Sequence, residues 1–341
     1  MALWRLTGIA GKIATVCLGA GAILTVSATL AASEPAQDFP TWLEGVKTDA
    51  LQKGISQNTV SGALDGIQPI DRVLELDRKQ PEFTLTFDDY LARVVPDARV
   101  KQGRKLLSQN KALLHGIAAR YHVPPNVVVA MWGIETDFGR LTGGFDVVPA
   151  LATLAYDGRR SQYFRTELMN ALTIIDQGIP AERMRGSWAG AMGQCQFMPS
   201  TYLRYAKAWK GDGPADIWTS QADALASAAN YLSSIGWNPH QGWGRAVKLP
   251  KGGIPSGLIG LDTVKSLKEW EKLGVRLPNG KPLPKSAIQA SLIRAETGKG
   301  DDVGVGQPYL VYDNFRVIMK WNRSTFFALG AGTLADRLAS K

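Results

Sequence analysis

Hydrophobic and polar positions follow a helical period over most of the chain before Trp237. Between Val100 and Tyr121, apolar side chains recur every three or four residues, with charged residues opposite them. The apolar positions are Leu106, Leu107, Leu113, Leu114, Ile117 and Ala118. This spacing turns one face of a helix toward a core. The pattern from Phe39 to Tyr121 therefore predicts a helical region.

A different helical pattern follows Pro124 and Pro125, residues that are tolerated in the first turn of a helix. Residues 126–135 are apolar on nearly every side, which is typical of a helix inside a core. The polar end of this segment is Glu135, and Gly139 follows shortly after. The pattern therefore places a carboxylate at the end of a buried helix.

The remaining pattern predicts an α+β fold that is mostly α. Further helices are predicted at 148–155, 161–177, 199–209 and 221–235, separated by Gly and Pro clusters. Short β-prone runs at 246–249, 291–295 and 309–311 predict a small β-containing subdomain, with one helical insert at 264–273. Residues 313–338 return to a helical pattern and are expected to pack back onto the core.

The first 32 residues have the features of an export signal. Arg5 and Lys12 supply positive charge, and the uncharged stretch 13–32 ends in small residues. About 20 apolar residues can also span a bilayer, so an uncleaved anchor is the alternative. Cleavage is the preferred interpretation, and it predicts a protein exported from the cytoplasm.

Composition narrows the class of protein. The 341 residues are 45% hydrophobic and 20% charged, which is ample for a buried core. The formal net charge of +9 suits an anionic polymer, although charge that only keeps the protein in solution explains it equally well. The sequence has no basic stripe or recognition module for nucleic acid, so we expect no nucleic-acid partner. Cys17 lies in the predicted signal, which leaves Cys195 without an intramolecular disulfide partner.

Glu135 has the sequence surroundings of a general acid. A carboxyl group among apolar side chains has a raised pKa, because desolvation disfavours its charged form. Met131, Trp132 and Ile134 precede Glu135 and could supply such walls. The alternative is an ordinary carboxylate at a helix end, paired with an arginine such as Arg140. The spacing alone allows both interpretations.

Several segments together resemble the membrane-bound lytic murein transglycosylase B family. The matching blocks are Gly133 to Thr136 with Gly139, ALATLAY at 150–156, Arg159, Arg160, Tyr163, Phe164, Ser187 to Gly190, GAMGQCQFMP at 190–199, 228–231, Gly236, Trp237, Asp313 to Phe315, Trp321, Asn322 and Ser324. These blocks follow the order of the family over most of the chain beyond the predicted signal. The resemblance implies a lysozyme-like catalytic core at 121–240, a helical domain at 33–120, a small β-containing subdomain at 241–309 and a C-terminal return to the core at 310–341.

The resemblance also implies an activity. Glu135 would act as the only acid and base in a cofactor-free, non-hydrolytic cleavage between N-acetylmuramic acid and N-acetylglucosamine in peptidoglycan glycan strands, giving 1,6-anhydromuramoyl ends in the periplasm. Most glycosidases need a second carboxylate. Asp137 is a poor candidate, because two residues further along a helix it would point to the opposite side. The alternatives are a water-using muramidase and a catalytically idle peptidoglycan-binding scaffold. Cell-wall synthesis and division proteins are candidate partners, and the sequence names none of them.

The resemblance carries six substrate contacts over to this chain. They are Gln196, Tyr231, Ser187, Arg159, Arg160 and Asn322. Hydrogen-bonding side chains and aromatic faces suit a sugar polymer. A structural role also fits each residue: Ser187 could cap a helix, Gln196 could bond to the backbone, and the aromatic rings could lie in the core.

Three positions depart from the family pattern. Trp321 and Phe327 stand where tyrosine is frequent, so we expect hydroxyl contacts to be absent there. Cys195 occupies a position where a small or hydroxylated residue is usual, and we interpret it as a packing substitution and not a nucleophile.

The segment KGDGPADIW at 210–218 is similar to a calcium-binding loop found in some family members. The pattern requires oxygen ligands at its first and third positions, where this chain has Ala208 and Lys210. Three carboxylates remain nearby, those of Asp212, Asp216 and Asp223. The lysine at a ligand position argues against a cation, so we expect no metal site here.

Overall fold

The structure is a computed structural model that describes residues 37–79, 85–295 and 306–340. The predicted export signal, 1–32, lies outside these residues. Helices dominate and the strands form two small sheets, which confirms the predicted α-rich composition. In the ranges just given, no helix has both the length and the apolar character needed to cross a bilayer.

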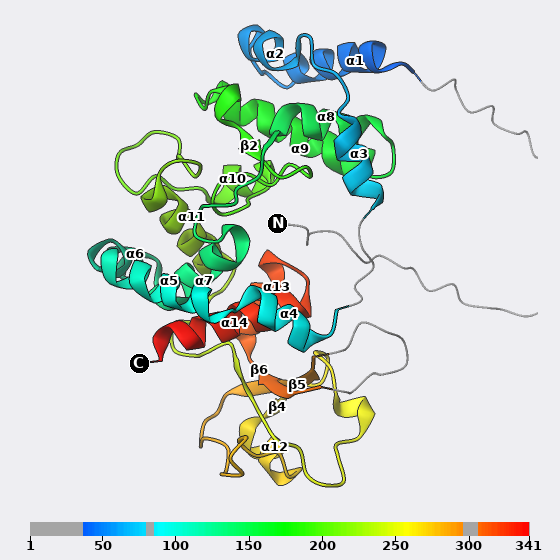
Figure 1. The fold of residues 1–341 in the computed structure, drawn as a ribbon. Helices are drawn as coiled ribbons and strands as arrows, with labels where there is room; N and C mark the ends of the chain where they lie inside the picture. Colours follow the sequence, from blue (N-terminus) through cyan, green and yellow to red (C-terminus); the bar gives the residue numbers. More distant parts are fainter. Residues whose placement is uncertain (1–36, 80–84, 296–305, 341) are drawn as a thin grey trace, which may run out of the picture.

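Most of the helices fall into two groups along the molecule (Figure 1). In chain order, the first eight helices of the described residues are α1 (Phe39–Gln52), α2 (Gln57–Leu64), α3 (Asp71–Arg78), α4 (Phe87–Val94), α5 (Asp97–Gln109), α6 (Lys111–Tyr121), α7 (Pro125–Thr136) and α8 (Val147–Tyr156). The others are α9 (Ser161–Asp176), α10 (Pro199–Tyr205), α11 (Gln221–Ser234), α12 (Leu267–Lys272), α13 (Asp313–Trp321) and α14 (Thr325–Ala339). One group is built around α8 and α9, with α1, α2 and α3 against them; the other is built around α7 and α14, with α4, α5 and α6.

Helix α7 is the central helix of the second group. It packs against α5, α6, α11 and α14, so it has neighbours on all sides. This packing matches the sequence, because nearly every α7 side chain is apolar and buried. Pro125 occupies the first turn, where its missing N–H has no helical partner to lose. The predicted helix 126–135 is therefore confirmed, with one extra residue at each end.

The predicted helical insert at 264–273 is observed as the shorter α12, and two other predicted helices also differ in extent from the observed ones. The helical pattern from Val100 to Tyr121 is divided between α5 and α6 by Asn110, whose side-chain Nδ2 donates to the carbonyl oxygen of Leu106 at 3.0 Å. Such a bond competes with the continuing helix. The helix predicted at 199–209 ends at Tyr205, because the following backbone is taken up by side chains of α11: Lys207 N donates to the hydroxyl of Ser227 at 2.9 Å.

The strands form one four-stranded and one two-stranded sheet within the described residues. The larger has the order β3 (Gly244–Ala246), β6 (Pro308–Val311), β5 (Gln289–Arg294) and β4 (Lys265–Ser266), all antiparallel. In the smaller, β1 (Phe145–Asp146) pairs with β2 (Arg185–Gly186). The predicted strands at 291–295 and 309–311 are confirmed, whereas the run at 246–249 lies later than the observed β3.

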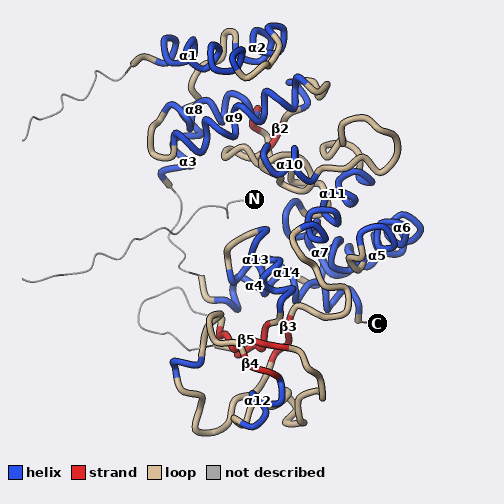
Figure 2. The backbone as a smooth tube through the Cα atoms, turned by 180° about the vertical axis from the view of Figure 1, so that it is seen from behind, coloured by secondary structure: helices blue, strands red, loops and turns tan. Residues whose placement is uncertain are grey.

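The larger sheet lies at the end of the molecule opposite α1 (Figure 2) and has its own apolar core. Trp270 of α12, Leu292 of β5 and Leu310 of β6 are fully buried there. Strand β6 leads directly into α13, which returns the chain to the helices around α7. Helix α14 packs against α7 and α13 packs against α14, so this segment brings the end of α13 to the end of α7.

Candidate active site

Glu135 lies in the last turn of α7 and is 7% exposed. Its Oε1 accepts a hydrogen bond from Nε1 of Trp321, the last residue of α13, at 2.6 Å. The indole is itself 2% exposed. Arg140, the partner that the alternative interpretation gave to Glu135, forms an ion pair with Asp137. The candidate acid therefore faces a neutral donor inside an apolar region.

The end of α7 turns sharply after Thr136. Asp137, Phe138 and Gly139 have φ values of 51°, 60° and 82°, which is the left-handed region. This turn folds the ring of Phe138 back under the helix, where a Cβ added to Gly133 would lie 2.7 Å from its Cε1. Gly133 is thus required by the close approach of the ring, which explains part of the motif around Glu135.

A second contact fixes the end of α7 to the segment 190–199. The hydroxyl of Thr136 donates to the carbonyl oxygen of Gln194 at 2.8 Å. The indole N–H of Trp132 donates to Oε1 of the same glutamine at 3.1 Å. Gln194 was not a predicted site residue, although it lies inside the most specific block of the resemblance. It anchors the helix that carries Glu135.

Asp137 has surroundings opposite to those of Glu135. Its carboxylate forms ion pairs with Arg99, at 3.1 Å, and with Arg140. Burial raises the pKa of Asp137, but the hydrogen bonds from Arg140 and Arg99 outweigh it and hold this pKa below the ordinary value. The sequence argument against Asp137 assumed a continuing helix. The helix ends instead, and the two arginines keep Asp137 ionised.

An aromatic cluster surrounds Trp321. The ring of Tyr231 lies at 4.9 Å from the indole, and that of Phe197 at 5.4 Å, between centroids. Tyr231 also stacks on Tyr205 at 4.6 Å and donates its hydroxyl to the carbonyl oxygen of Lys320 at 3.3 Å. The structure thus brings the predicted contact Tyr231 to the wall beside Glu135.

Gln196 and Ser187 are buried and hydrogen-bonded to nearby backbone. Nε2 of Gln196 donates to the carbonyl oxygens of Thr142 and Gly193, both at 2.9 Å. The hydroxyl of Ser187 accepts from the backbone N–H of Ala191 at 3.0 Å. These bonds fix the orientation of both side chains. The structural role considered for Gln196 is therefore present, and Ser187 closes a turn and does not cap a helix.

Arg159 and Arg160 share one buried carboxylate, that of Asp77 in α3. Nε of Arg159 donates to Oδ2 of Asp77 at 3.0 Å, and Arg160 contacts Oδ1. The Arg159 side chain remains 54% exposed, whereas that of Arg160 is 20% exposed and lies over the ring of Phe164. Asp77 was missed in the sequence, since nothing near it in the chain indicates these partners.

Asn322 is buried directly after α13. Its side-chain Oδ1 accepts from the backbone N–H of Ser324 at 3.1 Å. This bond shapes the connection between α13 and α14 and so supports the position of Trp321.

Two further side chains lie in the electrostatic field of Glu135. Burial raises the pKa of Tyr90, and the charge of Glu135 raises it further. The same two causes, in the same order, raise the pKa of the Cys195 thiol. Cys195 donates to the carbonyl oxygen of Ala224 at 3.0 Å. A thiol with a raised pKa is a poor nucleophile, which supports the packing role expected for Cys195.

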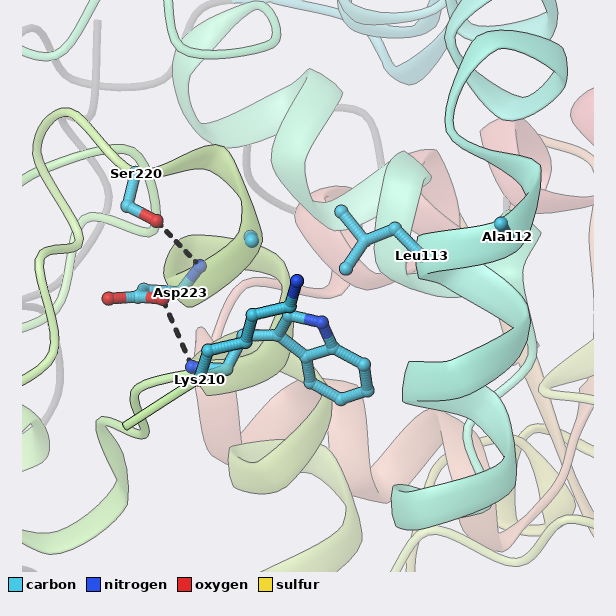
Figure 3. A pocket seen from close by; sticks show the side chains of 7 residues that line it. Ala112, Leu113, Lys210, Ser220 and Asp223 are labelled. Carbon is cyan, nitrogen blue, oxygen red and sulfur yellow. Dashed lines mark hydrogen bonds between the residues drawn. The ribbon is translucent and has the colours of Figure 1, made fainter. Parts of the chain in front are cut away.

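A pocket lies away from these residues, between α6 and the loop that precedes α11 (Figure 3). It is lined by Ala112, Leu113, Trp209, Lys210, Ser220, Ala222 and Asp223. In Figure 3, Leu113 and Asp223 lie on opposite sides of the pocket. The lining contains none of the residues predicted to bind substrate. The predicted site and this pocket are therefore different places.

Two of the three carboxylates near the loop resembling a calcium site, those of Asp216 and Asp223, are engaged with protein donors. Asp223 accepts from the backbone N–H of Trp209 at 3.0 Å and from that of Asp216 at 2.9 Å. Asp216 in turn accepts from the N–H groups of Trp218 and Thr219 and forms an ion pair with an arginine. Among the described residues, no cluster of three His, Cys, Asp or Glu side chains is arranged to hold a metal ion. The donor set does not fit a calcium loop.

The chain is similar to known proteins in sequence and in structure. The model of the transglycosylase SLT domain matches residues 38–336. The membrane-bound lytic murein transglycosylase B of Escherichia coli K12 is 35% identical over 249 residues, which are 72% of this chain and 65% of that protein. The chain thus spans slightly less than two thirds of that relative.

Solved structures are similar over most of the chain. The crystal structure of SltB3 from Pseudomonas aeruginosa in complex with NAG-NAM-pentapeptide is 44% identical, with a TM-score of 0.84 over 89% of this chain and 80% of that one. The Escherichia coli lytic transglycosylase Slt35 in complex with calcium is 30% identical, with a TM-score of 0.72 over 87% of this chain and 92% of that one. These matches confirm the predicted fold class, a mostly helical lysozyme-like core with small sheets. The chain belongs to the transglycosylase SLT domain family.

Proposed function

We propose that this protein is a lytic transglycosylase that cleaves the β-1,4 bond between N-acetylmuramic acid and N-acetylglucosamine in peptidoglycan. The observation that carries this proposal is the contrast between two carboxylates at the end of α7. Glu135 is buried against the neutral indole of Trp321, whereas Asp137 is ion-paired with Arg99 and Arg140. A carboxyl group beside a neutral donor is suited to exchanging a proton, whereas the two arginines stabilise the ionised form of Asp137. Further support comes from the complex of the similar SltB3 with NAG-NAM-pentapeptide.

The proposed reaction uses Glu135 twice. As an acid, it protonates the oxygen that leaves C1 of the muramoyl residue, while the acetamido oxygen of the substrate stabilises the cation that forms. As a base, it then takes the proton of the C6 hydroxyl, whose oxygen forms the new bond to C1. One C–O bond breaks and one forms, so the 1,6-anhydro end arises without water or a cofactor.

We propose that the six predicted contacts divide into two groups. Arg159 is the most exposed of them and suits an anionic group of the peptide stem. Gln196, Ser187, Tyr231, Asn322 and Arg160 are more buried, and the bonds described above join them to protein atoms. Tyr231 packs against Trp321, the donor to Glu135, and we propose that all five residues offer their remaining polar atoms and ring surfaces to sugars.

The test is the reaction product. Purified peptidoglycan is incubated with the protein lacking residues 1–32 or with its Glu135→Gln variant, and the soluble muropeptides are analysed by mass spectrometry. We expect anhydro ends from the unaltered protein and a loss of about a thousandfold in the variant, because the amide cannot donate and recover the proton. Reducing ends would make the protein a muramidase. Equal binding of peptidoglycan with no release by either protein would make it a scaffold.

We also propose where the protein is located in the cell and that it does not require calcium. The export signal predicted at 1–32 would place the protein in the periplasm, where glycan strands and the proteins of cell-wall synthesis or division are its candidate partners. Calcium is bound by the similar Slt35. In this chain Asp216 and Asp223 already accept backbone N–H groups and Asp216 also pairs with an arginine, so we propose that the loop folds without calcium.

A further inference from the structure

The excess positive charge of the chain is concentrated in its small β-containing subdomain. Residues 37–240, which include α1 to α11, contain 21 Lys and Arg residues and 21 Asp and Glu residues, so their formal charges cancel. Residues 241–309 contain eleven Lys and Arg residues against six Asp and Glu residues. In the described part, 241–295, there are ten against three. A surface that only has to stay in solution can intersperse the two signs, so this separation calls for another explanation.

Two segments of this subdomain are held together by their backbones. The N–H of Lys248 donates to the carbonyl oxygen of Arg276 at 2.8 Å, and the N–H of Arg276 donates back to Lys248 at 3.0 Å. Side chains directly opposite in such an antiparallel pair lie on the same face. A Cβ added to Gly274 would lie 2.9 Å from Cβ of Pro250, so the segments also stay close beyond this pair.

Four exposed lysines lie on these two segments, and we call them the lysine cluster. They are Lys248, Lys251, Lys272 and Lys281. Lys251 directly follows Pro250, and Lys272 ends α12, two residues before Gly274. A turn brings Lys281 back to the same place, because its carbonyl oxygen accepts from the N–H of Leu277 at 2.9 Å. Helix α12 and its surroundings form the end of the molecule (Figure 1).

The lysine cluster keeps most of its charge. In the ranges that the structure describes, none of its four members forms an ion pair. The acidic residues of α12 are Glu269 and Glu271, and the carboxylate of Glu269 is engaged at the start of the helix, where the N–H of Ser266 donates to it at 2.8 Å. Arg276 adds a further positive charge beside Lys248. Because like charges on facing positions repel, an anionic partner would stabilise this arrangement.

The subdomain offers little apolar surface to a lipid bilayer. Its two tryptophans, Trp243 and Trp270, are buried. The large apolar side chains that it exposes, among the described residues, are Val264 and Leu273. Protein surfaces that lie on a membrane usually insert several aromatic or leucine side chains beside their basic residues. The lysine cluster therefore favours an anionic polymer in water over a membrane.

A row of peptide stems is such a polymer. A stem with a free end carries a C-terminal carboxylate, and stems recur along a glycan strand. Lysine is suited to groups at variable spacing, because its ammonium is a compact charge on a flexible stem. The subdomain is also joined to the candidate active site, since β6 leads into α13, whose last residue, Trp321, donates to Glu135. Stems bound at the lysine cluster would keep Glu135 near the strands.

We propose that the lysine cluster is a second binding surface for peptidoglycan, which recognises the carboxylates of peptide stems away from the bond that is cut. The proposal rests on the function proposed above, because it takes the same polymer as the partner. Each lysine supplies one weak, exposed contact, and several contacts together retain the protein on the polymer. Such binding weakens as salt rises, because ions screen exposed charges.

The test compares two sets of four lysines. The cluster variant carries Lys248→Gln, Lys251→Gln, Lys272→Gln and Lys281→Gln. The matched control carries Lys53→Gln, Lys105→Gln, Lys111→Gln and Lys207→Gln, all at exposed lysines of the neutral region 37–240. Both sets are made in a parent protein that lacks residues 1–32 and carries Glu135→Gln, so that the polymer is not cut. Binding to insoluble peptidoglycan is measured by sedimentation at about 50 mM and about 500 mM salt, and thermal unfolding checks each fold.

At the lower salt we expect the cluster variant to bind peptidoglycan about tenfold more weakly than the parent, and the control to bind like the parent. The difference should shrink at the higher salt, because the contacts are exposed. Equal losses in the two variants, or no loss in either, would show that the charge only keeps the protein in solution and would overturn the proposal.

Modified peptidoglycan tests the proposal without altering the lysines. When the stem carboxylates are converted to neutral amides, the parent should bind no better than the cluster variant. Undiminished binding of the parent to the amidated polymer would refute recognition of the stems. Vesicles of phosphatidylcholine with about one third phosphatidylglycerol test the other class of partner. Cluster-dependent binding to these vesicles that exceeds binding to peptidoglycan would assign the surface to a membrane and overturn the proposal.

Failure of the proposed function has a different signature from failure of this proposal. The function fails if the unaltered protein releases no anhydro ends, or if Glu135→Gln releases as many as the unaltered protein. Neither result changes the sedimentation of the cluster variant relative to its control. Loss of the lysine contacts, in turn, leaves the identity of the released ends unchanged.

Discussion

Glu135 and Asp137 are two residues apart, yet they end in opposite environments. Glu135 turns into the aromatic region around Trp321, where its observed donor is neutral. Asp137 turns toward Arg99 and Arg140, which hold its pKa below the ordinary value. A carboxylate fixed by cations stays charged and serves the structure, whereas one fixed by a neutral donor can exchange its proton. The partner, more than burial itself, separates the two roles.

Asp77 extends this comparison, because it is more deeply buried than Glu135 but is held by two arginines. Burial alone would make it a candidate acid. Its partners place it with Asp137 among the structural carboxylates. The comparison can be tested at three places.

The largest effect is expected at Asp77. Asp77→Asn leaves Arg159 and Arg160 without their shared carboxylate, so we expect a loss of about 3 kcal/mol in the free energy of unfolding. The matched control is Asp49→Asn, which removes a more exposed ion pair with Arg165 and should cost about 0.5 kcal/mol. Urea denaturation measures both. Equal losses would show that Asp77 is not a structural carboxylate.

A smaller effect is expected at Asp137, and it should depend on pH. The folded state holds the pKa of Asp137 below its unfolded value of about 3.9, so its contribution is present above that pH and is lost as pH falls through the folded pKa. We expect Asp137→Asn to be less stable than the unaltered protein by about 1 kcal/mol at pH 7. The difference should shrink below about pH 4. Urea denaturation at pH 7 and pH 3 measures it, and a constant difference would contradict the ion-pair explanation.

The smallest effect is expected from calcium. Because Asp216 and Asp223 already accept backbone N–H groups, neither millimolar calcium nor a chelator should change Tm. Asp223→Asn weakens two of these bonds and should lower Tm, with no recovery on adding calcium. A rise in Tm with calcium in the unaltered protein would contradict this prediction, because it would show that the protein binds calcium.

Local pattern predicted much of this molecule correctly. The all-round apolar character of 126–135 predicted α7 as a core helix ending at Glu135, and the β-prone runs at 291–295 and 309–311 predicted two strands. The helix boundary at Asn110 was missed, because apolar periodicity continues across it while a side-chain bond interrupts the backbone.

The partners of the site residues could not be predicted in the same way. Trp321 lies 186 residues from Glu135, and Asp77 lies 82 residues from Arg159. The absence of a hydroxyl at Trp321 was read from the sequence as a lost contact, whereas the indole supplies a donor of its own. Gln194 lies in a block of the resemblance, so the sequence could have indicated it as a site residue. Nothing in the sequence near Asp77 indicated its role.

The sequence by itself determined which helix is buried, which carboxylate ends it, and which family the chain resembles. These follow from hydrophobic periodicity and from motifs that are local in the chain. Only the tertiary structure decided that Glu135 meets a neutral indole while Asp137 and Asp77 meet arginines. The physical reason is that the proton affinity of a carboxyl group depends on the donors and charges within a few ångströms, and folding brings those from distant parts of the chain.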